Sequence, residues 1–408
     1  KAAKLWELTS GPEHAELVNE YFRNIGQAAP FRPVADGGRG LPSEQQTYDR
    51  LSEAFRTAGV YNADLSVYGG SDNTAYYLSA GYNKQESILK PISFDRANFR
   101  FNIDQKINNK LKIGSSNGIS RTGRNQGRAG DGPQGGILQA ALHTPTYLSP
   151  YNEQGVLVGR AGFDNLTLLL DNYDVGSTSL RYIGNVYGEY QISPELKFRS
   201  TFSVDYNNYN EHEYWNKLLI AGSGVNGLAT SAISQSTTWI NEQTLTYRKR
   251  LGTHHTIGAL LGNTLQGSYY SLTSAEGRGF ATNDFTLINT AATTTSNQDW
   301  DQYKLASFFG RIDYAFDDKY LFDLSLRADG SSKFNKGYQW GYFPAIGAAW
   351  RLSKENFVQD VAFLNDLKLK TSYGLTGNQN GINSFASRQL WSGVGSSYRG
   401  VAGIFPEQ

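Results

Sequence analysis

The sequence predicts an all-β fold, and more specifically a transmembrane antiparallel β-barrel. Three observations predict it: strict alternation of polar and apolar residues, unusually long strands, and tight turns that alternate with long loops. Strands of soluble proteins average about 5–6 residues, whereas a tilted strand needs about 9–11 residues to cross a bilayer. We expect about twelve strands, many of them 10–18 residues long. Their approximate ranges are 62–70, 75–84, 96–105, 110–120, 178–190, 195–207, 235–248, 253–270, 301–316, 319–332, 341–351 and 366–376.

The alternation is clearest in the segment 195–207. Phe198 and Phe202 share one face of the expected strand, while Arg199 and Thr201 share the other. Successive side chains of a strand point to opposite faces of the sheet, so this pattern gives one apolar face and one polar face. In a membrane barrel the apolar face would meet lipid and the polar face would line the lumen.

The connections between the expected strands alternate in length. Short links occupy 71–74, 107–110, 192–195, 249–252 and 316–319 and read as hairpin turns, and long links occupy 121–177, 208–234, 272–300 and, more briefly, 333–340. Outer-membrane barrels have short periplasmic turns and long extracellular loops. We therefore expect the tight turns in the periplasm and the long loops outside the cell.

Residues 1–60 have a different pattern and are expected to form helices and loops. Ser10 and Glu13 have the spacing of a capping box, and apolar residues follow at helical spacing. A second helix is expected to start at Ser43 and to stop before Gly59, with a Pro- and Gly-rich loop, 28–42, between the two helices. The rest of the chain, 61–408, is assigned to the barrel.

Composition excludes several classes of function. The 408 residues carry a formal net charge of +1, so bulk electrostatics do not favour a nucleic-acid partner. Cysteine is absent, which excludes disulfides, a thiolate nucleophile and a Cys-ligated metal. No apolar run approaches the roughly 18 residues of a membrane helix.

Signals of catalysis are weak. The five histidines form no zinc signature, and His212 and Glu213 are expected in a polar loop. The stretch 222–227 matches GxGxxG, but no strand–turn–helix context is expected around it. The Arg/Gly run 121–136, with Arg121, Arg124 and Arg128, is interpreted as a loop. We expect neither an enzyme, a cofactor nor a metal site.

Three long motifs carry a family resemblance. They are Leu65–Ser71 followed by Thr74–Tyr82, then Leu326–Phe334 with Gly341–Trp350, then Leu364–Gln379. Together they resemble the SusC/RagA-type TonB-dependent outer-membrane transporters. The motifs occur in order and span most of the chain.

The resemblance implies a barrel of twenty-two strands with a plugged lumen. Twelve strands cannot close such a barrel, so we expect this chain to be its N-terminal half, without the plug. Residues 1–60 would then be an extracellular loop between the first barrel strands, and 61–408 a partial barrel.

The implied function is active import of a large nutrient, an oligosaccharide or a peptide, across the Gram-negative outer membrane. The implied partners are a SusD-like surface lipoprotein, outer-membrane lipid, and the TonB complex acting through the missing plug region. One alternative is a soluble or surface-attached β-rich module for carbohydrate binding or adhesion, against which the turn–loop alternation argues. Another is a passive pore.

Exposed aromatic residues with polar neighbours are the expected contacts for cargo or for the capping lipoprotein, because sugars and peptides both dock on such surfaces. The candidates lie in the expected long loops and at their bases. They are Tyr209, Tyr214, Trp215, Trp300, Tyr338, Trp340 and Trp391.

Overall fold

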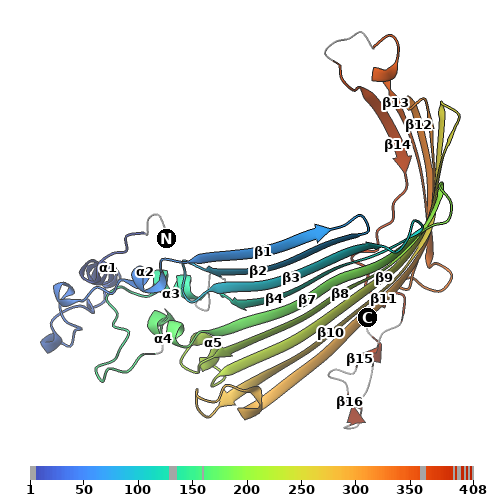
Figure 1. Cartoon of the computed structure of the whole chain (residues 1–408). Coiled ribbons are helices and arrows are strands. Elements are labelled where there is room, and N and C mark those ends of the chain that lie inside the picture. The colour runs from blue at the N-terminus through green and yellow to red at the C-terminus, as the bar shows by residue number, and fades with distance from the viewer. Residues whose placement is uncertain are drawn as a thin grey trace.

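The computed structural model describes residues 6–127, 136–158, 160–358 and 364–388, together with the short pairs 391–392, 397–398, 401–402 and 405–406. Its main element is one twelve-stranded antiparallel sheet in which each strand pairs with the next one along the chain. Figure 1 shows this meander as a broad, curved and strongly twisted sheet, with the helices gathered at one end of the strands. No helix in the described part of the chain is long and apolar enough to cross a membrane.

All twelve expected strands are present, most of them longer than expected. They are β1 (Val60–Gly70), β2 (Thr74–Glu86), β3 (Ser93–Lys106), β4 (Leu111–Asn125), β7 (Asp174–Gln191), β8 (Leu196–Trp215), β9 (Leu228–Leu251), β10 (His255–Phe280), β11 (Ala291–Phe316), β12 (Tyr320–Ser331), β13 (Trp340–Arg351) and β14 (Lys368–Gly374).

The remaining elements are short. The helices are α1 (Gly11–Asn24), α2 (Arg50–Ala54), α3 (Ile137–His143), α4 (Leu166–Asp171) and α5 (Ile220–Ser223), with 3₁₀ turns η1 (Val34–Asp36), η2 (Pro42–Glu44), η3 (Ile288–Thr290) and η4 (Leu352–Lys354). Three two-stranded pairs complete the fold: β5 (Arg160–Ala161) with β6 (Phe163–Asp164), β15 (Trp391–Ser392) with β18 (Phe405–Pro406), and β16 (Ser397–Tyr398) with β17 (Val401–Ala402).

Local turn chemistry sets the tight hairpins. Asp317 and Asp318 join β11 to β12 with φ values of 53° and 52°. Positive φ at both central residues is the requirement of the hairpin turn whose twist matches that of the strands, and Asp tolerates this conformation. The turns expected at 71–74, 107–110, 192–195 and 316–319 are confirmed, and the β9–β10 turn lies slightly later, at residues 252–254.

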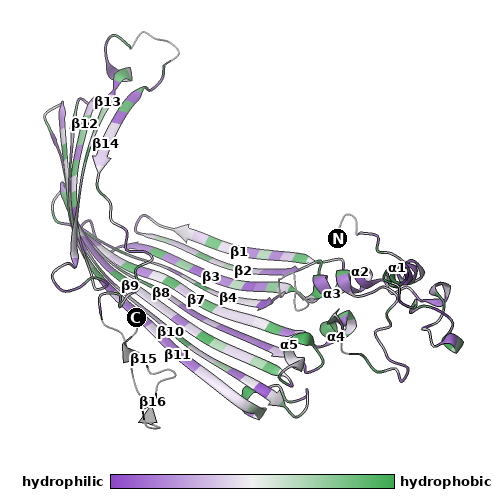
Figure 2. Cartoon of the chain, turned by 180° about the vertical axis from the view of Figure 1, so that it is seen from behind, coloured by the Kyte–Doolittle hydropathy of each residue, from purple (hydrophilic) through white to green (hydrophobic). Residues whose placement is uncertain are grey.

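The two faces of the sheet differ in polarity as the alternation predicts. Phe202 stacks on Trp239 of β9, with ring centroids 6.5 Å apart. Phe198 lines a shallow depression on the same side with Leu245 and Leu261. We call this side the apolar face and the opposite, concave side the polar face. Figure 2 shows apolar and polar positions alternating along the strands.

The buried apolar core lies beside the strand ends, among the helices. Leu51 of α2, Ile137 of α3, Leu166 of α4 and Trp215 at the end of β8 are each no more than 2% exposed and form one cluster. This helical cap occupies the end of the sheet where the longer connections lie (Figure 1). A single-layer sheet cannot bury its own apolar side, so the cap supplies the only large hydrophobic cluster among the described residues.

The first helix is as predicted, but the second differs. Ser10 and Glu13 form the expected capping box at the start of α1. The helix expected to start at Ser43 is instead the single turn η2 followed by the five-residue α2, which Asp49 caps. The amide of Tyr48 donates to the carbonyl of Thr146, 2.9 Å away. This hydrogen bond to a distant segment holds the residues between η2 and α2 in an extended conformation.

The predicted boundaries of the long loops are wrong, because the flanking strands continue into these segments. β4 runs to Asn125, so Arg121 and Arg124 lie on a strand rather than in a loop, and Arg128 lies outside the described residues. His212 and Glu213 likewise belong to β8. The link after β4 also contains α3 and α4, which the expected loop 121–177 did not include. Backbone pairing to a neighbouring strand outweighs the weak β-propensity of these polar residues.

The assignment of the two faces is testable in the full-length protein. Phe202→Arg places a charge on the apolar face, and at a bilayer midplane this costs about 2–4 kcal/mol. Thr201→Arg places the same charge on the polar face, where Arg199 already lies. We expect Phe202→Arg to reduce the amount of heat-modifiable folded protein in outer membranes far more than Thr201→Arg does. Equal losses would contradict the assignment.

Candidate functional site

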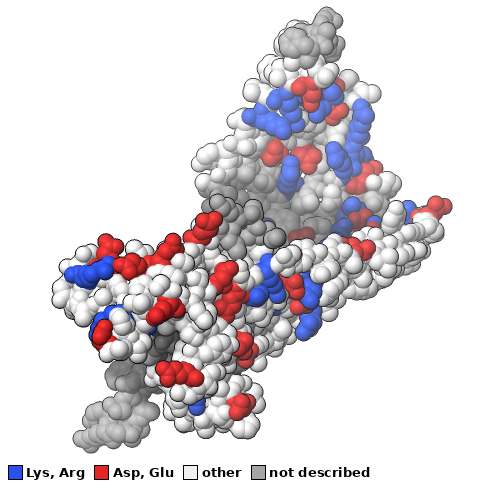
Figure 3. Space-filling model, turned by 90° about the vertical axis from the view of Figure 1, so that its left-hand side faces the viewer, with Lys and Arg blue, Asp and Glu red and all other residues white. Residues whose placement is uncertain are grey.

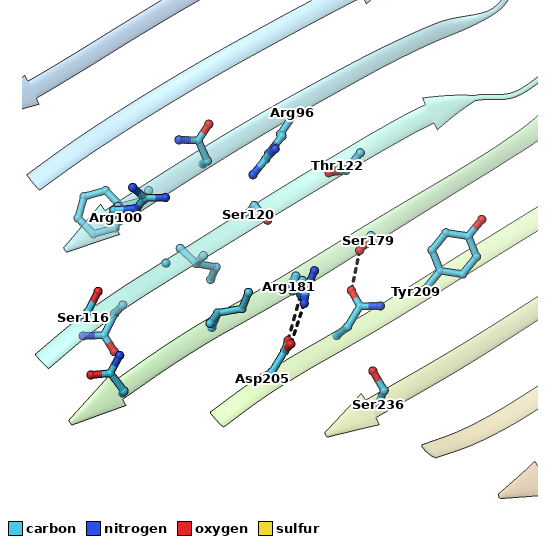
Figure 4. A pocket seen from close by; sticks show the side chains of 18 of the residues that line it. Arg96, Arg100, Ser116, Ser120, Thr122, Ser179, Arg181, Asp205, Tyr209 and Ser236 are labelled. Carbon is cyan, nitrogen blue, oxygen red and sulfur yellow. Dashed lines mark hydrogen bonds and ion pairs between the residues drawn. The ribbon is translucent and has the colours of Figure 1, made fainter. Parts of the chain in front are cut away.

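A groove with a volume of about 790 Å³ lies on the polar face of the sheet. Five neighbouring strands, β3, β4, β7, β8 and β9, supply its lining, and Figure 4 shows their side chains projecting from the same side of the sheet. We call it the polar groove. Its polar lining residues are Arg96, Asn98, Arg100, Asn102, Ser116, Asn117, Ser120, Thr122, Arg124, Ser179, Arg181, Asn185, Asp205, Asn207, Tyr209 and Ser236.

Strand register brings these residues together. On β3, Arg96 and Arg100 are an even number of residues apart, so they share the polar face. Arg96 pairs with Thr122 and Arg100 with Gly118 on β4. A Cβ at Gly118 would fit without a clash, since the nearest atom, the carbonyl oxygen of Ile183, would lie 3.9 Å from it. The floor of the groove therefore has room for a side chain at this glycine.

The groove has a surplus of positive charge. Four arginines and one aspartate line it, and no Lys or Glu does. Arg181 binds Asp205 through two hydrogen bonds, of 3.0 and 2.7 Å. Within the described residues, Arg96 and Arg100 form no ion pair, and the guanidinium of Arg124 stands 5.7 Å from the ring centre of Phe94. Among the residues that the structure describes, the guanidinium groups of Arg96, Arg100 and Arg124 thus have no carboxylate partner.

The neutral part of the lining consists mostly of hydroxyl and amide groups, and two pairs of them bond to each other. Ser179 donates to Asn207 over 2.8 Å, and Ser116 donates to Asn102 over 2.7 Å. Gln126 donates to the hydroxyl of Tyr209, 3.3 Å away, at one end of the groove. Such a surface offers many donors and acceptors but little apolar area, so it suits a hydroxyl-rich or charged ligand.

Another depression, of about 350 Å³, lies where the second and third motifs of the family resemblance meet. Ser331 donates to Gln379 over 2.6 Å, and Arg327 bonds to Asp329 and to Ser307. The ring of Phe343 approaches Gly377 so closely that a Cβ there would lie 2.4 Å from it. These motif residues mainly hold β11–β14 to the segment that follows them.

The sequence-predicted aromatic residues divide into buried and accessible ones. Tyr214 and Trp215 are 5% and 2% exposed. Tyr214 packs edge-on against Phe280, and Trp215 packs within the helical cap. Both lie at the end of β8, which the sequence placed in a loop, and their burial makes them packing residues rather than exposed contacts. Tyr209, in contrast, lies in the polar groove (Figure 4).

The other candidates lie nearer the C-terminal strands. Tyr338 and Trp300 are 81% and 51% exposed, and Trp300 contacts the ring of Phe385 edge-on. Trp340 borders the smaller depression, but its ring stacks on Phe308 of the apolar face. The side chain of Trp391 lies outside the described residues. Within the described part of the chain, no single site brings the other six candidates together.

Sequence reasoning missed the arginines of the groove. The only signal for Arg96 and Arg100 was their shared parity on one strand, and Arg181 is some 80 residues further along the chain. Among the described residues, no group of three His, Asp or Glu side chains is arranged to hold a metal ion.

Relatives of known family align along nearly the whole chain. TonB-dependent receptor P26 of Formosa agariphila is 31% identical over 98% of this chain, and TonB-dependent receptor SusC of Bacteroides thetaiotaomicron is 27% identical over 96% of it. The chain belongs to the family of SusC/RagA-type TonB-dependent receptors. Members of this family are outer-membrane transporters rather than enzymes. No family profile matches the chain.

The fold agrees with this assignment. The chain superposes on a solved structure of the RagAB peptide transporter with a TM-score of 0.78 and 22% identity, covering 98% of this chain and 48% of that one. It spans about 40% of the length of the two curated receptors. The twelve-stranded sheet therefore corresponds to part of a receptor barrel.

Proposed function

We propose that this chain is part of an active importer of a large nutrient, an oligosaccharide or a peptide, that uses TonB-derived energy and a SusD-like surface lipoprotein. The observation that carries the proposal is the 31% identity to a TonB-dependent receptor over 98% of the chain. The polar groove supports it, because a polar lumen wall gives a hydrophilic cargo a hydrated surface to move along.

We propose that the apolar face meets lipid. Phe322, Leu324 and Leu326 of β12 are each more than half exposed. Contact of such apolar side chains with water is unfavourable, whereas contact with lipid is not. At the tight-turn end, Tyr320 stacks between Phe316 and Trp350, with ring centroids 6.3 Å apart on each side. Such a row of aromatic rings suits the interfacial girdle of a membrane barrel.

Dependence on TonB separates this function from a passive pore. A strain that expresses the full-length protein should grow on its nutrient, and deletion of TonB should abolish that growth while leaving the amount of protein in the outer membrane unchanged. Growth that persists without TonB would indicate passive diffusion. Recovery of the full-length protein in the soluble fraction without detergent would instead favour the alternative of a soluble adhesion or carbohydrate-binding module.

The sidedness of the sheet can be tested by labelling. We propose that the helical cap, including residues 6–60, and the loop 281–290 lie outside the cell, with the tight turns in the periplasm. Phe285 is 64% exposed in that loop, and Asp318 lies at a tight turn. With no native cysteine in this chain, a membrane-impermeant thiol reagent should label Phe285→Cys but not Asp318→Cys on intact cells. The reverse pattern would invert the topology.

The accessible aromatic residues are the proposed contacts for cargo or for the partner lipoprotein. Ala substitution of Tyr338 or Trp300 should lower growth on the nutrient, or co-purification of the partner, without changing the amount of protein at the cell surface. Trp340→Ala is the matched control for Tyr338, which is 81% exposed, because the ring of Trp340 stacks on Phe308 of the apolar face, with centroids 6.0 Å apart. If neither accessible residue affects either readout more than the control does, these aromatics are structural.

A further inference from the structure

We propose that the polar groove binds the acidic groups of an anionic oligosaccharide, through Arg96, Arg100 and Arg124. The inference rests on the proposed import function and narrows its cargo to a sugar chain that carries carboxylate or sulfate groups. It follows from three properties of the groove: unpaired arginines, their spacing, and a hydroxyl- and amide-rich lining.

The arginines are available for a ligand. Within the described residues, Arg96 and Arg100 have no carboxylate partner, while Arg181 is engaged by Asp205. Guanidinium is a planar fork of donors that matches the oxygens of carboxylate and of related oxyanions. An unpaired arginine on a groove wall is therefore ready to bind an acidic group.

The positive charge is local to this groove. A separate depression of about 590 Å³, nearer the helical cap on the same face, is lined by Glu211, Glu213 and Glu276 instead. Of these, Glu276 forms an ion pair with Arg278, 2.5 Å away. Since the whole chain has a formal charge of only +1, the surplus in the polar groove comes from how the strands sort their side chains and not from overall composition.

The spacing indicates a ligand with repeated charges. Arg96 and Arg100 are four residues apart on one strand, a separation of about 13 Å between their backbones. Arg124 is the diagonal neighbour of Arg96 across the β3–β4 pair, at about 7–8 Å. One small anion cannot bridge all three, whereas acidic groups repeated along a chain can bind them one by one.

The rest of the lining favours a sugar over a peptide. Side chains such as Asn98, Ser120, Thr122 and Ser236 present hydroxyl and amide groups to the groove. A sugar ring carries several hydroxyls that need such partners, while a peptide of mixed sequence needs apolar pockets for its side chains. Tyr209, at one end of the groove, offers a single ring on which a sugar can pack.

The test uses the full-length receptor purified in detergent and two probes that differ only in charge, sulfated dextran oligosaccharides and unsulfated dextran oligosaccharides of equal length. We expect the sulfated probe to bind at least about tenfold more tightly, with an affinity that falls as salt rises. The combined variant R96Q/R100Q/R124Q should weaken this binding by more than about tenfold. Arg121 lies on β4, as Arg124 does, but outside the groove lining, so Arg121→Gln should change the affinity for the sulfated probe less than about twofold.

Two further variants keep the proposal falsifiable if the triple variant does not fold. Asp205→Asn releases Arg181 and should strengthen binding of the sulfated probe. Gly118→Leu leaves every charge in place but fills the open floor of the groove, and it should weaken binding. Heat-modifiable migration in gels confirms that each variant is a folded barrel.

The outcomes distinguish this inference from the proposed function. Equal affinity for the two dextrans, no binding of either, or equal effects of Arg121→Gln and the groove variants would overturn it. Tight binding of hexaglutamate with the same dependence on Arg96, Arg100 and Arg124 would overturn the assignment to a sugar. TonB-dependent growth together with any of these results leaves the import function standing, whereas groove binding without TonB-dependent growth contradicts the import function alone.

Discussion

The fold depends on one continuous ladder of backbone hydrogen bonds, which runs without a crossover from β1 to β14. A backbone amide or carbonyl left without a partner in lipid costs several kcal/mol, so a spanning strand must be paired along its whole length. This requirement accounts for the long strands. β10 and β11 pair from His255 with Phe316 at the tight turn to Phe280 with Ala291 near the cap, well beyond the length needed to cross a bilayer.

The same ladder separates the chemistry of the two faces. Because neighbouring strands are in fixed register, alternate residues of every strand point to the same side, and a polar groove can form next to an apolar surface without any second layer. The sheet thus has no core of its own. The large hydrophobic cluster lies in the helical cap, where Trp215 and Leu166 are buried at the strand ends, and this packing holds the long connections against the sheet.

The features that the sequence predicted correctly depend on interactions between residues close together along the chain. The capping box of Ser10 and the hairpin at Asp317 were predicted, because each depends on residues within a few positions of one another. The second helix and the burial of Tyr214 were not, because each depends on contacts with distant segments: Tyr48 bonds to Thr146, and Tyr214 packs on Phe280. The edges of the long loops were wrong for the same reason, since a strand continues wherever its neighbour offers a partner.

The sequence by itself determined the class of fold, the number of strands in the sheet, the polarity of its faces and the family, because alternation, turn residues and motifs are all written locally along the chain. Only the tertiary structure decided which residues share a site. Arg96, Thr122, Arg181 and Asp205 come from four strands spread over more than 100 residues, and their proximity depends on the register of each pairing in between. A shift of one residue in any of these pairings would send part of the groove to the other face. Tight turns set the register of β3–β4 and of β7–β8, but β4 and β7 are joined by a long connection, so no turn sets the register of that pairing.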